Sequence, residues 1–151
     1  MEVLVKNLTS MPLRRATLKR VAKRALELEC GDSNAELSIV LVDDGSIAEL
    51  NKRYRGIEEP TDVLAFPQIT QENDAKGEDS EEVRILGDVV ISLQTADRQA
   101  RENGWPLEQE VALLLIHGIL HLLNYDHQSK ADSKRMREKE AAILVELGFK
   151  P

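Results

Sequence analysis

Apolar and polar residues follow one another along the chain in blocks that predict a mixed α+β fold. Short β-branched and apolar segments that end in turn-forming residues predict strands at 3–5, 36–42, 61–66 and 83–93. Apolar residues at helical spacing predict helices at about 12–29, 46–54, 95–103, 107–124, and from 129 or 132 to 147. The chain is therefore expected to form one domain over residues 1–151, with a single mixed sheet of about four strands packed by about five helices.

Turn and cap residues refine this outline. Asp43 to Ser46 ends the second strand and caps the helix that follows, and Pro12 suits the first turn of the first helix. Gly87 interrupts the last strand, where a glycine permits a bulge or a close backbone approach. The polar, acidic segment 68–82 shows neither the helical nor the strand spacing of apolar residues and is expected to be a long loop.

Composition indicates a folded globular protein, because 42% of its 151 residues are hydrophobic and 31% are charged. A formal charge of −7 argues at first against a phosphate-bearing partner. The charge is uneven, however: residues 14–24 contain six bases and no acid, whereas 72–82 contain six acids and one lysine. The basic helix is either a solvated outer face or a phosphate-binding surface, and the net charge does not decide between them.

Several features predict a cytoplasmic protein. The single cysteine, Cys30, excludes an internal disulfide, and the N-terminus lacks the basic and apolar regions of a secretory signal. The longest apolar run, 111–123, is too short to span a bilayer and contains two histidines. It is expected to be a buried helix, with no membrane association.

The three histidines of the chain lie within eleven residues, at His117, His121 and His127. The first two are four residues apart on a predicted helix, so that their rings project from one face and can hold one metal ion. Asn124 can end the helix and let the chain turn back to deliver His127. Unpaired imidazoles inside an apolar helix would carry a desolvation cost, which a shared metal removes.

Three imidazoles favour zinc and leave a fourth position for water, as in catalytic sites, although nickel, cobalt or copper can occupy such ligands in vitro. Zinc lowers the pKa of that water, so hydrolysis is the expected reaction class. Asp126 either orients a ligand ring or belongs to a turn. In zinc peptidases a glutamate follows the first histidine as general base, whereas this chain has Gly118, which gives room for a substrate or a neighbouring strand.

The histidine segment resembles the signature H-G-x-L-H-L-x-G-Y-D-H of the YbeY family of bacterial metal-dependent endoribonucleases. It reads His-Gly-Ile-Leu-His-Leu-Leu-Asn-Tyr-Asp-His at 117–127. Three further blocks occur in the family's order: Tyr54-Arg55-Gly56, Pro-Thr-Asp-Val-Leu-Ala-Phe-Pro at 60–67, and Leu-Gly-Asp-Val-Val-Ile at 86–91. The resemblance therefore covers nearly the whole chain.

The resemblance implies a zincin-like fold with zinc on His117, His121 and His127. It implies cleavage of single-stranded RNA, processing of the 16S rRNA 3′ end, and ribosome quality control, with His117 essential and Arg55 contacting the substrate. The implied partners are the small ribosomal subunit, its ribosomal protein S11, and the GTPase Era.

Arg55 suits this role, because a planar guanidinium matches a phosphate and the charge of its transition state. Taken alone, an arginine near a helix end is more often a solvated residue or a carbonyl cap. The chain departs from the family pattern at four positions: Asn124, Ala65, Ile57 and Glu59. Two other functions stay open, a small zinc metallopeptidase and a non-catalytic ribosome assembly factor whose zinc only supports the fold.

Overall fold

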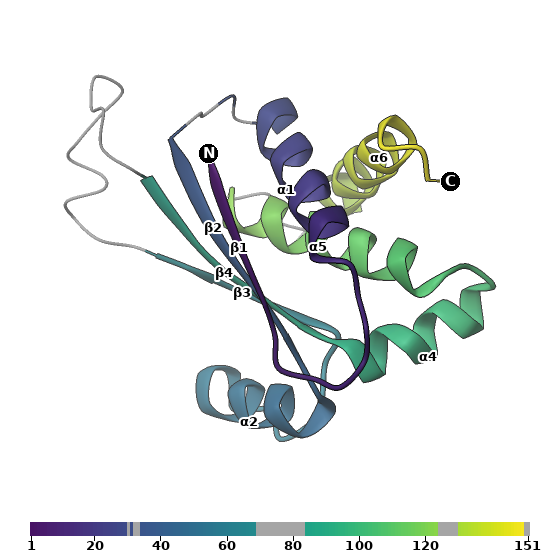
Figure 1. The fold of residues 1–151 in the computed structure, drawn as a ribbon. Coiled ribbons are helices and arrows are strands. Elements are labelled where there is room, and N and C mark those ends of the chain that lie inside the picture. The colour runs from purple at the N-terminus through teal and green to yellow at the C-terminus, as the bar shows by residue number, and fades with distance from the viewer. Residues whose placement is uncertain (30, 32–33, 69–83, 124–129, 150–151) are drawn as a thin grey trace.

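The computed structural model describes residues 1–151 except 30, 32–33, 69–83, 124–129 and 150–151 (Figure 1). Its elements in chain order are β1 (Glu2–Asn7), α1 (Arg15–Glu29), β2 (Ala35–Val42), α2 (Asp44–Arg55), β3 (Val63–Pro67), β4 (Arg84–Ser92), α4 (Leu93–Asn103), α5 (Leu107–Leu122) and α6 (Lys130–Glu146). The predicted α+β class, with one mixed sheet and about five helices, is confirmed. Cys30, Asn124, Asp126, His127 and nearly all of the predicted 68–82 loop lie outside the described residues.

The sheet has the strand order β1-β2-β4-β3. β1, β2 and β4 run parallel, and β3 pairs antiparallel with β4 at the edge, with Val63 opposite Ile91. β1 and β2 are parallel because α1 returns the chain between them on one face of the sheet, whereas α2 and β3 lie between β2 and β4 along the chain. None of the helices in the described ranges is long and apolar enough to cross a lipid bilayer.

Alternating side chains of the strands divide the core between the two faces of the sheet. Leu37 and Ile39 of β2 and Val89 of β4 belong to a large buried cluster that α1, α4, α5 and α6 complete. Val90 of β4 faces the other way, into a small cluster with Ile47 of α2. Figure 1 shows the result: α2 lies alone on one side of the sheet, opposite α1, α5 and α6.

The first helix begins later than the sequence predicts. A helix starting at Pro12 would have its Arg15 N–H donate to the Met11 carbonyl. That carbonyl instead accepts from the Asn7 side-chain amide at 2.9 Å, within a turn in which Asn7 Oδ1 also accepts from the Thr9 N–H. The prediction of a helix from residue 12 is therefore wrong by three residues, because side-chain hydrogen bonds extend the turn.

The bulge predicted at Gly87 is present, together with the close backbone approach. The register between β2 and β4 shifts where Glu36 pairs with Ile85 and Leu37 pairs with Gly87. Gly87 has a φ of 139°, and a Cβ there would overlap the Phe66 carbonyl oxygen of β3. Both conditions require glycine.

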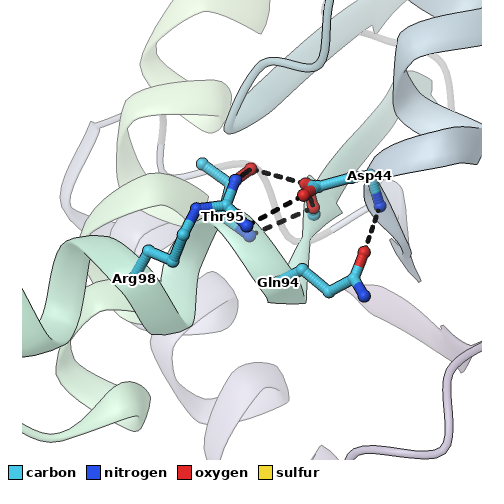
Figure 2. Close-up of polar contacts among 5 residues, drawn as sticks. Asp44, Gln94, Thr95 and Arg98 are labelled. Carbon is cyan, nitrogen blue, oxygen red and sulfur yellow. Dashed lines mark hydrogen bonds and ion pairs between the residues drawn. The ribbon is translucent and has the colours of Figure 1, made fainter.

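Asp44 joins the starts of α2 and α4, two helices that leave adjacent parallel strands toward opposite faces of the sheet. Its carboxylate accepts from the Ser92 hydroxyl at 2.7 Å, the Thr95 hydroxyl at 2.6 Å and the Arg98 guanidinium at 2.9 Å. Its own N–H donates to Gln94 at 2.8 Å (Figure 2). Burial alone would raise the pKa of Asp44, but the hydrogen bonds from Thr95, Ser92 and Arg98 outweigh it and lower that pKa.

We expect Asp44→Asn to lower the free energy of unfolding at pH 7 by about 1–3 kcal/mol, because the charge-assisted hydrogen bonds are lost. The native carboxylate has the lower pKa, so its contribution is full above the ordinary carboxyl pKa and is lost as the pH falls through the native value. Urea unfolding of wild type and variant at a series of pH values measures this difference. Asp97→Asn, which removes a pair with the exposed Arg101, is the control; equal losses in the two variants would contradict the role given to Asp44.

Candidate metal centre

α5 is apolar nearly all round and is buried between the sheet and the other helices. Its start is fixed by Glu110, which is 3% exposed and accepts from the Trp105 indole N–H at 2.8 Å. Burial raises the pKa of Glu110, and the hydrogen bonds from Trp105 and Asn103 oppose that rise. The helix is thereby held in place two turns before its histidines.

His117 and His121 are half-buried on one face of α5, one turn apart, as the spacing predicts. Their ring centroids are 4.7 Å apart at 67°. The two Nε2 atoms face each other at 3.1 Å. The structure therefore brings the same ring nitrogen of the two residues together.

Glu140 of α6 determines which nitrogen of His117 is available. Its Oε1 lies 2.5 Å from His117 Nδ1, and the residue is only 8% exposed. A carboxylate accepts hydrogen bonds, so Nδ1 carries the proton and donates it, which leaves a lone pair on Nε2. A carboxylate behind a histidine in this way is the usual partner of a metal-ligating imidazole.

The arrangement fits a divalent metal ion. Two metal–nitrogen bonds of 2.0–2.1 Å at a tetrahedral angle place the nitrogens about 3.3 Å apart, close to the 3.1 Å between the two Nε2 atoms. Among the residues that the structure describes, no group of three ligating side chains gathers at one point. The third predicted ligand, His127, lies outside them.

Gly118 faces the sheet. A Cβ at this position would lie 2.7 Å from Val89 Cγ1 of β4 and 3.4 Å from Val63 Cγ2 of β3. Of the two uses predicted for this glycine, the structure supports close packing against a neighbouring strand. It leaves no room for the glutamate that follows the first histidine of zinc peptidases.

Arg55 lies on a different side of the molecule from the histidines. It is exposed at the end of α2, the helix on the opposite face of the sheet from α5. The neighbouring Tyr54 ring packs on Phe66 of β3, with centroids 5.0 Å apart. β3 is the edge strand of the sheet and α5 packs against it as well, so Arg55 and the histidines flank the same edge from its two faces.

Glu140 is the site residue that sequence reasoning missed. Asp126 was a candidate for orienting a ligand ring or for a turn, and it lies outside the described residues. The sequence contained a sign of this role. Glu140 lies at helical spacing from the apolar residues Met136, Ile143 and Leu144, so a carboxylate occupies the buried side of α6. Buried carboxylates are rare unless they are paired, and the histidine on α5 is the partner.

We expect Glu140→Gln to weaken zinc binding by about 10–100-fold, because a neutral amide holds the Nδ1 proton less firmly and lowers the basicity of Nε2. Competition with a chromophoric chelator measures this affinity without reference to activity. Glu138→Gln, two residues away and exposed beside Lys134, is the matched control and should bind zinc as the wild type does. Wild-type affinity in Glu140→Gln would refute the role assigned to this carboxylate.

Comparison with known proteins identifies relatives over nearly the whole chain. The profile of the family described as Endoribonuclease YbeY matches residues 5–148. A protein named Endoribonuclease YbeY from Pelotomaculum thermopropionicum is 50% identical over 132 residues, covering 87% of this chain and 85% of the relative. One of the same name from Aquifex aeolicus is 47% identical over 146 residues, with 96% and 91% covered. A Thermotoga maritima protein solved in solution superimposes with a TM-score of 0.59 at 26% identity, covering 95% of this chain and 90% of that one.

Proposed function

Because the chain belongs to the YbeY endoribonuclease family, we propose that it is a metal-dependent endoribonuclease that cuts single-stranded RNA in ribosomal RNA maturation. Its substrate in this proposal is the 16S rRNA 3′ end on the small ribosomal subunit in the cytoplasm, with a further part in ribosome quality control. Ribosomal protein S11 and the GTPase Era are the proposed protein partners. The observation that carries the proposal is the pair of facing Nε2 atoms backed by a buried carboxylate.

The proposed ligands are His117, His121 and His127. A zinc ion held there would supply a Lewis acid and an activated water for attack on a phosphodiester. Glu140 holds the proton of His117 at Nδ1 and fixes its ring. Arg55 offers a charged, planar donor to a phosphate oxygen, where its positive charge offsets the extra negative charge of the transition state.

A zinc peptidase is the first alternative, and the packing of Gly118 counts against it. The zinc-loaded protein is expected to cut unstructured RNA, to leave a hairpin of the same composition intact, and to leave a peptide library intact. Chelation should stop the RNA cleavage. Chelator-sensitive proteolysis with intact RNA would overturn the proposal in favour of a peptidase.

The second alternative is an assembly factor whose zinc only supports the fold. We expect the metal-free protein to keep its helical circular dichroism, because the large buried cluster is built from apolar side chains of the sheet and four helices. Spectra before and after dialysis against a chelator make the comparison. Loss of the helical signal on metal removal would support the structural role instead.

A further inference from the structure

The outer side of α1 carries a surface, here called the α1 basic face, that the proposed site does not use. It consists of five exposed cations, Arg14, Arg15, Lys19, Arg20 and Lys23. The opposite side of the helix is buried in the core through Leu18, Val21, Ala22, Ala25 and Leu26. Packing of the core involves only this buried side of α1. It therefore does not explain why the exposed side carries only positive charges.

Acidic residues near the C-terminal end of α1 already pair with other cations. Arg24 forms ion pairs with Glu27 and with Glu146 of α6. Glu29 pairs with Lys139 of α6 at 3.1 Å.

Arg20 differs from the rest of the face, because its guanidinium donates to the Leu147 carbonyl at 3.3 Å. Within the described part of the chain, the other four residues, Arg14, Arg15, Lys19 and Lys23, form no ion pair. The face therefore carries positive charge that the surrounding described surface does not neutralise.

This charge opposes folding of the helix. Arg15, Lys19 and Lys23 follow one another at spacings of four residues, where like charges lie side by side and repel. Lys19, Arg20 and Lys23 also line a shallow open groove, which Glu27 and its ion-pair partner Arg24 complete. A repulsive feature that costs stability and serves no packing role is typical of a binding surface.

The α1 basic face lies on the same side of the sheet as the histidines. α1 and α5 share the large buried cluster, and Figure 1 shows α1 and α6 side by side above α5. The ion pair between Glu29 and Lys139 joins the end of α1 to α6 next to Glu140, the partner of His117. The helical rise places Lys19 about 15 Å along α1 from Glu29. An RNA segment of a few nucleotides covers that distance.

From these observations we propose that the α1 basic face binds the sugar-phosphate backbone of the RNA strand outside the segment that is cut. The inference rests on the proposed ribonuclease function. The face has no aromatic residue, so it contacts phosphates without base stacking and does not select sequence. It raises the affinity of this acidic protein for long RNA. A short RNA that fills only the metal centre does not reach the face, so its affinity is not raised.

The test is a double variant, Lys19→Gln and Lys23→Gln, which keeps helix propensity and removes two cations. Binding is measured by fluorescence anisotropy with metal-free protein, on unstructured RNAs of about 5 and about 20 nucleotides over a range of salt concentrations. The variant should bind the long RNA about tenfold more weakly, and the slope of log affinity against log salt should become shallower by about 1.4. Binding of the short RNA should not change.

Arg101→Gln with Lys134→Gln is the control, because it removes two exposed cations that already have acidic partners. It should bind both RNAs as the wild type does, and thermal melts should show that neither double variant is less stable. If the Lys19→Gln, Lys23→Gln variant bound the long RNA with the affinity and salt slope of the wild type, the proposal would be overturned. The α1 basic face would then be a surface for an acidic protein. An equal loss on both RNAs would also overturn the proposal. Because binding is measured without metal, failure of the nuclease proposal would appear separately, as absence of cleavage by the wild type.

Discussion

Replacing His117 with alanine is expected to abolish cleavage of single-stranded RNA, with a rate loss of about 10³-fold or more. The substitution removes one of the two facing Nε2 atoms and leaves Glu140 without its partner. The proposed metal then loses a ligand, and the phosphate loses the ion that would polarise it. Cleavage of a labelled, unstructured RNA by zinc-loaded protein measures the rate.

His121→Ala should behave in the same way, because it removes the other of the two facing Nε2 atoms. Glu108→Ala, in the first turn of the same helix, should keep wild-type activity when purified in parallel. Equal cleavage by all preparations would show that a contaminating nuclease or another site is responsible.

Arg55→Ala should lower kcat by about 10²–10³-fold, the usual cost of removing one charged donor from a transition state. Arg55→Lys should recover only part of the rate, because an ammonium group lacks the paired donors of a guanidinium. Steady-state kinetics on the same RNA separates kcat from KM.

Arg53→Ala is the matched control, since Arg53 is exposed in the same last turn of α2. It should change kcat little. If Arg55→Ala raised KM and left kcat intact, Arg55 would hold the RNA on its way around the β3 edge and would not act on the reacting phosphate.

Local sequence signals predicted the elements and most of their ends. Asp43 was expected to cap the second helix, and its carboxylate accepts from the Ser46 N–H at 2.8 Å. The β-branched and apolar residues of 36–42 predicted β2, which places Leu37 and Ile39 on one face of the sheet. Such features depend on residues a few positions apart, so the sequence contains them directly.

The chemistry of the site was only partly predictable. The spacing of His117 and His121 predicts that both rings lie on one face, and the structure brings their Nε2 atoms together. The contact with Glu140 joins residues that are 23 positions apart and depends on how α6 packs on α5. No local pattern specifies that packing, although a carboxylate on a buried stripe indicated that a partner was needed.

The reason for Gly118 also required the fold. The sequence offered two uses for this glycine, and the position of Val89 and Val63 against α5 decided between them. The run of bases at 14–24 stays open to two interpretations, and the fold adds which neighbouring acids are already engaged, through the ion pairs of Arg24 and Lys139.

Cleavage of single-stranded RNA is proposed to depend on a metal ion held by the histidine pair of α5. The most direct test of this dependence is to titrate zinc into chelator-treated protein, and to measure bound zinc and the RNA cleavage rate on the same samples. We expect the rate to rise in proportion to bound zinc and to saturate at one ion per chain, and we expect His117→Ala neither to bind zinc tightly nor to cut RNA. A cleavage rate independent of bound zinc would contradict the proposal.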